Sequence, residues 1–202
     1  MKIIVVFPTR TEARYFSHDA VETAICGVGL TAAAYTTGKL IHERRPDVLI
    51  LAGIAGVYAG SSLKIGDTVL VASEREADLG FFTAGGFRHL SKLDLDMDFD
   101  VNTVLHCPHL PAQPPLPLAH SNSMNAALAP FIDTDGIDIE NMEGAAFFHA
   151  CLQAGQRFYE LRSVSNRVTL EDEAWDFDAS IRNLTDGLHV LINWLQAEPA
   201  QP

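Results

Sequence analysis

Cysteines, basic residues and long apolar runs are all scarce in this chain of 202 residues. The three cysteines, Cys26, Cys107 and Cys151, are odd in number and far apart, which argues against a disulfide framework and against a CxxC metal or redox site. No run of about 18 apolar residues occurs, and the apolar stretch before Pro8 is too short for a signal-peptide core or a membrane span. We therefore expect a cytoplasmic protein in a reducing compartment.

Basic residues are outnumbered by acidic ones. The chain has 14 Lys and Arg against 26 Asp and Glu, and its formal charge is -12. Duplex nucleic acid and anionic membranes need a basic face to neutralise phosphates, so neither is an expected partner. A local basic pocket remains compatible with this composition.

Apolar residues make up 48% of the chain, which is enough to bury one core, and we expect one domain over residues 1–202. Continuous apolar runs alternate with helical stretches, at residues 2–7, 47–56, 67–73 and 158–166. Such runs are typical of strands that helices cover on both faces. Helical spacing at 29–45, ended by Pro46, and at 180–196 predicts two of these helices. The fold class is therefore α/β.

Two segments between these helices have other patterns. Residues 106–120 are rich in proline and exclude a regular helix, whereas "LDLDMDFD" at 93–100 alternates like an exposed strand or an acidic loop. His106 and His109 are the nearest pair of histidines, and they lie in the proline-rich segment without metal-site spacing. We assign no metal.

Two glycine-containing segments follow predicted strands. "GIAG" at 53–56, which includes Ala55 and Gly56, comes directly after an apolar strand, where glycine lets a ligand approach the backbone. It predicts either a ligand loop or a tight turn, and it matches neither a P-loop nor a dinucleotide fingerprint. The second segment, 27–38, is interpreted as a strand-to-helix turn, although a helix N-terminus can also bind an anion.

Two glutamates stand out by position. Glu12 falls in the first turn of a helix after the first strand, where a carboxylate often only complements the helix dipole. Glu143 is less easily explained, because "IENMEGAAFF" otherwise reads as a buried helix and an unpaired buried carboxylate costs several kcal/mol. Its partner is predicted to be either Arg162, in an ion pair, or the hydroxyl groups of a ligand.

The strand in "FYELRSVSNRV" ends at Ser165 and Asn166. Asparagine at a strand end commonly caps a turn. Its amide also places a donor beside an acceptor, which suits an amide-like edge of a ligand.

Four features in this order resemble the nucleoside phosphorylase and nucleosidase superfamily, over roughly residues 1 to 180. They are Glu12, "AGIAG" followed by "LKIGDTVLVAS", "ENMEGAAFFHAC" and "RSVSN". Within the superfamily, the last two are most similar to the futalosine hydrolases. The resemblance implies a three-layer α/β/α fold with a central mixed sheet, an active site at the strand ends and assembly at least as a dimer. It implies no cofactor.

The resemblance also implies roles for individual residues. Glu12 would bind or activate the attacking water with help from Arg162, and Glu143 would bind the ribose hydroxyls. Met142 would pack against the sugar, and the segment with Ala55 and Gly56 would approach the substrate. Trp175 and Phe177 would either cover the base or pack the last helix.

Two residue choices bear on the reaction. Adenine-specific nucleosidases have aspartate where this chain has Asn166, and an asparagine can donate to O6 and accept from a protonated N7, so a 6-oxopurine is predicted. "AGIAGVYAGSSLK" has no arginine for phosphate, which favours water as the acceptor, while Arg10 and Arg44 leave phosphorolysis open.

Other functions also stay open. They are a methylthioadenosine/S-adenosylhomocysteine or aminofutalosine nucleosidase, a purine nucleoside phosphorylase, and a nucleoside-binding protein without catalysis. A carboxylate-bearing 5′ extension would need a basic residue, for which Arg88, His89 and Lys92 are candidates if they are not simply a solvated loop.

Overall fold

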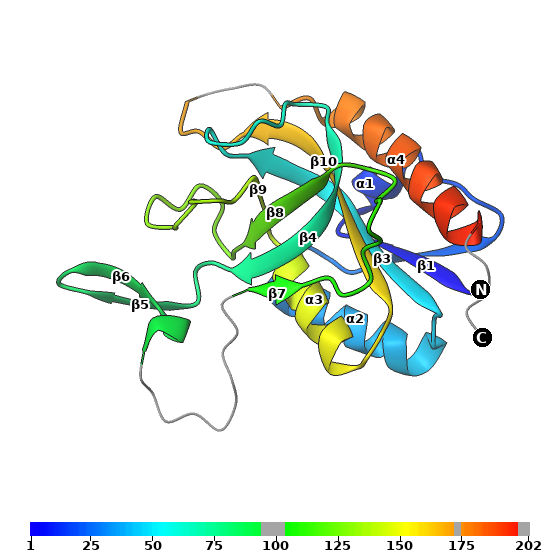
Figure 1. The fold of residues 1–202 in the computed structure, drawn as a ribbon, viewed down its shortest axis with the longest axis horizontal. Helices are drawn as coiled ribbons and strands as arrows, with labels where there is room; N and C mark the ends of the chain where they lie inside the picture. Colours follow the sequence, from blue (N-terminus) through cyan, green and yellow to red (C-terminus); the bar gives the residue numbers. More distant parts are fainter. Residues whose placement is uncertain (94–103, 172–174, 198–202) are drawn as a thin grey trace.

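The computed structural model describes residues 1–93, 104–171 and 175–197 (Figure 1). Its strands are β1 (Ile3–Phe7), β2 (Val21–Ile25), β3 (Val48–Val57), β4 (Thr68–Glu76), β5 (Gly80–Thr83), β6 (Gly86–His89), β7 (Leu105–His106), β8 (Leu118–Ser123), β9 (Ile139–Asn141) and β10 (Phe158–Arg167). Its helices are α1 (Arg10–Ala13), α2 (Leu30–Arg44), α3 (Gly144–Gln153) and α4 (Phe177–Ala197), with a short 3₁₀ helix η1 (Leu90–Lys92).

Eight of the strands form one mixed sheet. Its order is β10-β4-β8-β9-β3-β1-β2, β7 pairs with β4, and β10 also pairs with β3. The strands β3, β10, β4, β8 and β9 thereby close into a ring, from which β1 and β2 extend in parallel with β3. The β5–β6 hairpin is a separate sheet and projects from the body (Figure 1).

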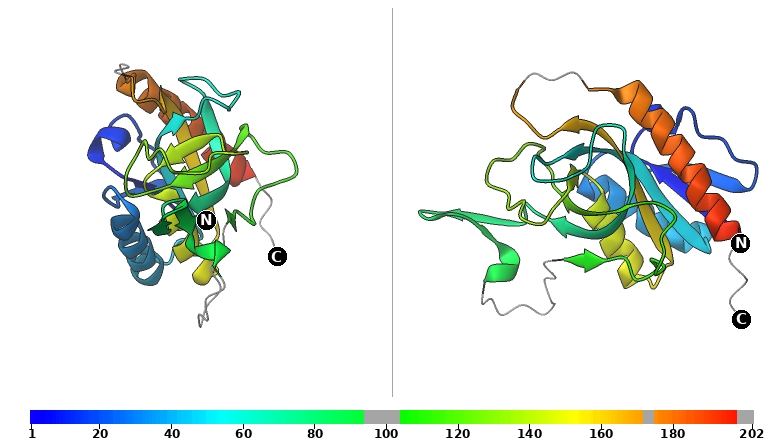
Figure 2. Two further views of the ribbon diagram at one scale, coloured as in Figure 1. Left: turned by 90° about the vertical axis from the view of Figure 1, so that its left-hand side faces the viewer. Right: turned by 45° about the horizontal axis from the view of Figure 1, so that its top comes forward.

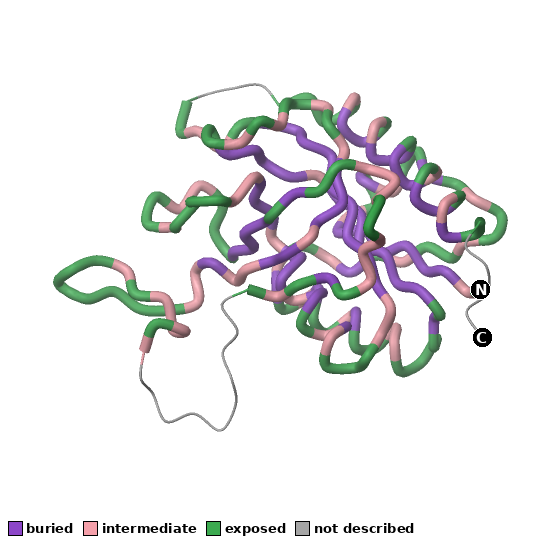
Figure 3. The backbone as a smooth tube through the Cα atoms, in the orientation of Figure 1, coloured by how far each residue is buried: buried purple, intermediate pink, exposed green. Residues whose placement is uncertain are grey.

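Helices cover both faces of the sheet. Figure 2 shows α4 across one face, and α2 and α3 pack together on the opposite face. The buried positions concentrate in the central strands between these layers (Figure 3). In β10, every residue from Phe158 to Asn166 is buried, as the continuous apolar run predicts. The expected three-layer α/β/α fold with a mixed sheet is confirmed.

The prediction of a loop or turn at "GIAG" is wrong. Residues 53–56 lie inside β3, which stays paired with β10 as far as Val57. The glycines do not interrupt the strand because β10 continues to pair with this segment and β9 pairs with Gly56 and Val57. The expected strands, the helices at 29–45 and 180–196, and the absence of a helix at 106–120 all agree with the structure.

Other expectations concern the acidic segment, the two histidines of the proline-rich segment and membrane crossing. Apart from Leu93, the acidic segment at 93–100 lies outside the described residues. His106 is exposed and His109 is half-buried. None of the helices within the described ranges has the length and apolar character needed to cross a bilayer.

Candidate functional site

One cavity of about 280 Å³ brings together most of the predicted site residues. It lies where β1, β3, β9 and β10 end, beside the first turns of α1, α3 and α4. Its lining includes Glu12, Ala55, Gly56, Met142, Glu143, Asn166 and Trp175. Of the predicted site residues, Arg162 alone does not line it.

Glu12 is fixed at the end of β1 by a short helix. Thr9 is the N-cap of α1, and its hydroxyl both accepts from the Glu12 N–H at 3.2 Å and donates to Glu12 Oε2 at 2.6 Å. The Ile54 N–H donates to Glu12 Oε1 at 3.2 Å. Burial raises the pKa of Glu12, although both hydrogen bonds oppose the shift. A carboxyl group of this kind is suited to proton transfer near neutral pH.

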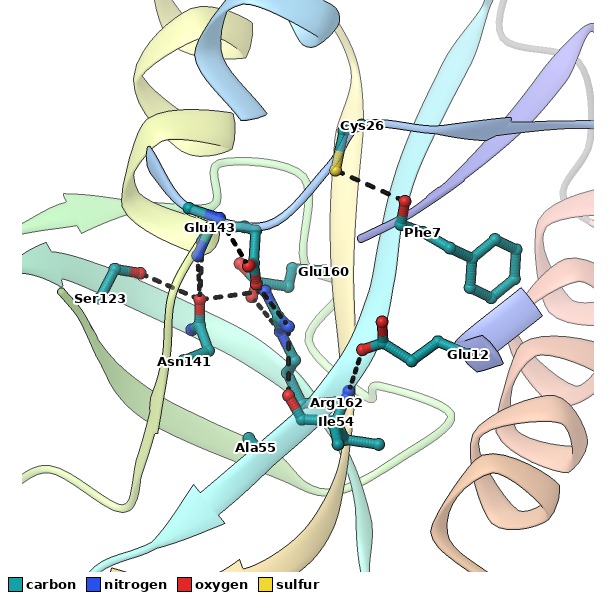
Figure 4. Close-up of polar contacts among 12 residues, drawn as sticks. Phe7, Glu12, Cys26, Ile54, Ala55, Ser123, Asn141, Glu143, Glu160 and Arg162 are labelled. Atoms are coloured by element: carbon teal, nitrogen blue, oxygen red, sulfur yellow. Dashed lines mark hydrogen bonds and ion pairs between the residues drawn. The ribbon is translucent and has the colours of Figure 1, made fainter. Parts of the chain in front are cut away.

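Glu143 stands at the N-cap position of α3, and its side chain is only 5% exposed. Its Oε2 accepts from Arg162 Nη1 at 3.2 Å and its Oε1 accepts from the Gly29 N–H at 3.1 Å (Figure 4). The predicted ion pair between Glu143 and Arg162 is therefore present. Because Glu143 also lines the cavity, the ion pair does not remove it from the reach of a ligand.

Arg162 lies behind the cavity wall with its side chain 1% exposed. Its guanidinium donates to Glu160 Oε1 at 2.7 Å, to the Ile54 carbonyl at 3.2 Å and to Asn141 Oδ1 at 3.0 Å, besides Glu143. Each nitrogen of the guanidinium is thus engaged by the protein. The structure brings Arg162 to the carboxylates rather than to the cavity space where a water would bind.

Because Gly53 of β3 has no side chain, Arg162 and Glu12 can both lie close to its backbone. A Cβ on Gly53 would lie 2.5 Å from Arg162 Nη1 and 3.1 Å from Glu12 Oε1. The guanidinium and the carboxylate therefore share the space that a side chain would fill. This close approach, rather than a ligand, accounts for the first glycine of "GIAG".

Gly56 lies beside Val168, Asn166 and Glu140 in the cavity wall. A Cβ on it would lie 2.9 Å from Val168 Cγ2, 3.2 Å from Asn166 Nδ2 and 3.5 Å from Glu140 Cγ. Asn166 follows a register shift in β10, and irregularities of this kind often re-aim a side chain. Its Oδ1 accepts from the Ser165 hydroxyl at 2.8 Å and its Nδ2 donates to the Arg167 carbonyl at 2.9 Å, so each group retains capacity for one further hydrogen bond.

The sequence analysis missed Glu140, a third carboxylate in the cavity wall. It is 6% exposed, and its two oxygens accept from the Tyr58 hydroxyl at 2.9 Å and from the Leu128 N–H at 3.1 Å. It lies in β9, paired with Gly56. The signal was its place in "IENMEGAAFF", three residues before Glu143.

The cavity rim is apolar. Trp175 and Phe177 stack with ring centroids 5.3 Å apart and stay 51% and 41% exposed. Val28, Ala127 and Leu128 continue the apolar lining. Trp175 therefore both packs against the start of α4 and faces the cavity, which keeps both of its predicted roles open.

No Lys or Arg occurs among the described residues that line this cavity, whereas three glutamates do. Arg10 is not in the lining, and Arg44 is at the surface beside Glu22, 3.7 Å away. The three candidates for a 5′ carboxylate, Arg88, His89 and Lys92, line a different cavity with Arg75, Phe87, Phe131 and Asp133. The described residues also contain no cluster of three or more His, Cys, Asp or Glu side chains suited to a metal.

Comparisons with known proteins identify the family of this chain. A family model described as the phosphorylase superfamily matches residues 13–193. A futalosine hydrolase of Thermus thermophilus is 31% identical over 159 residues, which cover 73% of this chain and 70% of the relative. A futalosine hydrolase of Acidothermus cellulolyticus is 33% identical over 183 residues, covering 79% and 70% respectively.

A solved structure shows the same fold. It is a 5′-methylthioadenosine/S-adenosylhomocysteine nucleosidase from Neisseria meningitidis in complex with methylthio-immucillin-A. The TM-score is 0.74 at 19% identity, and the match covers 96% of this chain and 99% of that chain.

Proposed function

The chain belongs to the phosphorylase superfamily, and we propose that it is a nucleosidase that hydrolyses the N-glycosidic bond of futalosine and releases hypoxanthine. The observation that carries the proposal is that Glu12, Glu143 and Asn166 line one cavity. They supply a candidate base, a candidate sugar ligand and a candidate partner for the departing purine. The relatives named futalosine hydrolase add support for this substrate.

The sugar would lie between Glu12 and Glu143. Breaking an N-glycosidic bond develops positive charge on the sugar, which nearby carboxylates stabilise. In this account Glu143 accepts hydrogen bonds from the ribose hydroxyls and Met142 packs against the sugar. Glu12 accepts one proton of a water as the water oxygen bonds to C1′. The bond between C1′ and the purine nitrogen breaks with its electrons going to the purine, which takes a proton from solvent at N7. Arg162 acts on both carboxylates through space and hydrogen bonds.

The base would lie against Gly56, where Asn166 and Glu140 flank the strand. A 6-oxopurine has an oxygen acceptor at C6 and an N–H donor at N1. Asn166 Nδ2 can donate to O6, its Oδ1 can accept from a protonated N7, and Glu140 can accept from N1–H. Adenine presents an acceptor at N1, so Glu140 would face it lone pair to lone pair. This pairing favours hypoxanthine as the departing base.

Water rather than phosphate is the proposed acceptor. Three glutamates line the cavity, and among its described lining residues none is Lys or Arg. A phosphate dianion placed there would meet like charge without a cation to hold it. Neutral water carries no such penalty.

One observation favours a second candidate, a methylthioadenosine nucleosidase. The carboxylate of the futalosine 5′ extension meets no basic side chain among the described lining residues, whereas the apolar rim suits an uncharged 5′ group such as a methylthio group. The two candidates differ in the departing base, which is hypoxanthine for futalosine and adenine for methylthioadenosine. Glu140 and Asn166 are the residues proposed to select between these bases.

The test is a product assay on the purified chain with futalosine, aminofutalosine or methylthioadenosine, each with and without phosphate. The proposal predicts hypoxanthine from futalosine at the same rate in both buffers. Release that requires phosphate would identify a phosphorylase, and faster release of adenine would identify the second candidate. Binding of hypoxanthine without turnover of any substrate would leave a nucleoside-binding protein.

A further inference from the structure

Glu74 and Glu160 are two buried carboxylates that take no part in the reaction proposed above. They are 0% and 1% exposed, and neither lines the cavity. Glu74 lies on β4 and Glu160 on β10, and an oxygen of each is pressed against Gly144, where a Cβ would clash with both. The two carboxyl groups therefore meet beside the first residue of α3.

Their hydrogen bonds are unequal. Glu74 Oε1 accepts from Asn141 Nδ2 at 2.6 Å, and its Oε2 accepts from the Ser123 hydroxyl at 2.7 Å. Glu160 Oε1 accepts from Arg162 Nε at 2.7 Å, but Glu160 Oε2 has no hydrogen-bond partner. A buried anion with one oxygen unsatisfied is far more costly than a buried neutral acid.

The charges around Arg162 do not balance if every carboxylate is ionised. Glu74, Glu160 and Glu143 surround it, Glu12 faces it from α1, and within the described part of the chain it is the only cation that contacts Glu143 and Glu160. Burial raises the pKa of Glu74, and burial together with Glu74 raises the pKa of Glu160 well above its ordinary value.

The nearby cysteine thiols do not change this balance of charges. Cys26 faces Glu143, and burial raises its pKa to about 12. Cys107 and Cys151 face Glu160 from the other side. Burial raises the pKa of Cys107 to about 11 and that of Cys151 in the same direction. All three thiols stay neutral at pH 7, so the titrating groups are the carboxyl groups themselves.

We propose that Glu74 and Glu160 hold one proton between them at neutral pH and act as positioning residues for Glu143. Two chains of contacts lead from the pair to Glu143. Glu160 holds Arg162, whose Nη1 donates to the Glu143 carboxylate. Glu74 holds Asn141, whose Oδ1 accepts from the Glu143 N–H at 2.8 Å and the Gly144 N–H at 2.7 Å. Figure 4 shows Asn141 beside Glu143.

The retained proton leaves the pair with a single negative charge. The positive charge of the Arg162 guanidinium is then not fully neutralised by Glu160, so it also pairs with Glu143. Glu143 keeps a cation on its inner oxygen, and its carboxylate stays available to the cavity. The pair thus acts on the substrate only through Arg162, Asn141 and Glu143.

The first test compares melting temperatures of wild type, Glu160→Gln and Glu74→Gln from pH 5 to pH 8. A carboxyl group whose pKa is raised by folding gives its full stability below the unfolded pKa and loses it as pH rises. Glutamine resembles the protonated acid and does not ionise. The melting temperature of Glu160→Gln minus that of wild type should therefore increase with pH. The exposed variant Glu22→Gln, which loses an ion pair to Lys2, should show no such increase.

A difference that stays constant or decreases with pH would overturn the proposal. If Glu160 and Glu74 are both ionised in the folded protein, neither takes up or releases a proton on unfolding between about pH 5.5 and pH 8, so the melting temperature of each glutamine variant would differ from wild type by a constant amount. Infrared spectra of the wild-type protein at pH 7 give an independent answer. The carbonyl band of a buried protonated carboxyl group should be present in wild type and weakened in both glutamine variants, and its absence from wild type would sink the idea.

The positioning role is tested kinetically and rests on the proposed function. Glu160→Leu removes the acceptor for Arg162 Nε and should raise KM about tenfold with a smaller change in kcat, because sugar binding is lost first. Glu160→Gln keeps that acceptor and should restore KM to within about twofold of wild type. Equal KM for both variants and wild type would contradict the positioning role. If wild type hydrolyses no nucleoside, the proposed function fails, while melting and infrared spectra still decide the proton.

Discussion

Arg162 Nη1 lies 3.2 Å from Glu143 Oε2, and the two side chains are 1% and 5% exposed. This ion pair joins a buried cluster of carboxyl groups to the wall of the cavity. Removing one partner of such a pair leaves an uncompensated charge that is largely buried. The stability of the fold and the orientation of Glu143 therefore depend on the same guanidinium.

We expect Arg162→Met to lower the free energy of unfolding by about 3–5 kcal/mol, because it strands the carboxylates of Glu143 and Glu160. Urea denaturation measures the change. The matched control is Arg44→Met, since Arg44 is paired with Glu22 while its side chain is 60% exposed. A loss as small as that of the control would show that the buried ion pair does not stabilise the protein.

Glu12 should set the acidic limb of the activity. As a base it must be ionised, and burial raises its pKa, so kcat/KM should fall with decreasing pH at a midpoint above the ordinary value of 4.5. Thr9→Val removes a hydrogen bond that opposes the shift, which should move this midpoint to higher pH. Thr9→Ser retains the hydroxyl and should leave the midpoint in place. An unchanged profile for Thr9→Val would assign the limb to another group.

Glu140 should select the base together with Asn166. In Glu140→Gln the new amide can donate a hydrogen bond from its NH2 group to N1 of adenine. To accept from N1–H of hypoxanthine, it has to rotate so that its oxygen faces the base. The selectivity for futalosine over aminofutalosine should therefore drop about tenfold or more. The ratio of kcat/KM for the two nucleosides is the measurement. Glu76→Gln is the control, because Glu76 does not line the cavity. Equal ratios for wild type and Glu140→Gln would remove Glu140 from base recognition.

Asn166→Asp tests recognition of the base at O6 and N7, the two atoms assigned to Asn166. An ionised aspartate would face O6 acceptor to acceptor, so turnover of the 6-oxopurine should weaken. A 6-aminopurine should be accepted in its place only when the new carboxyl group is protonated. Kinetics with both bases decide the outcome. Unchanged selectivity would show that Asn166 only caps the end of β10.

Gly144 should tolerate no side chain. A Cβ there would clash with Glu74 and Glu160, both of which are held by buried hydrogen bonds, so Gly144→Ala should be strongly destabilising and should raise KM through Glu143. Gly38→Ala offers the contrast in α2, because nothing lies within 4 Å of the added Cβ. There the helix propensity of alanine should raise the free energy of unfolding by about 0.5–1 kcal/mol. Similar melting temperatures for the two variants would contradict this packing.

Part of the site was predictable from the sequence because burial of a charge demands a partner. The apolar neighbours of Glu143 required an opposite charge or a ligand, and Arg162 proved to be that charge. Likewise, continuous apolar runs predicted strands covered on both faces, and the strand ends carried Glu12 and Asn166 to one cavity. These predictions rest on periodicity and burial, which local sequence reports well.

What remained hidden depends on register and on contacts between distant strands. Gly53 looked like part of a loop, but its role is to admit Arg162 and Glu12 from neighbouring elements. Glu140 and Glu160 stand in strands whose facing direction the sequence alone does not decide, since shifting a strand by one residue exchanges its faces. The β5–β6 hairpin likewise carries Arg88 to a separate cavity, which its local sequence did not indicate.

The central claim is that water attacks C1′ of a 6-oxopurine nucleoside in this cavity. The direct measurement is to hydrolyse futalosine in ¹⁸O-labelled water in the presence of phosphate and to weigh both products. We predict one ¹⁸O atom in the sugar product and none in hypoxanthine. A sugar phosphate, an unlabelled sugar product or no cleavage at all would contradict the account.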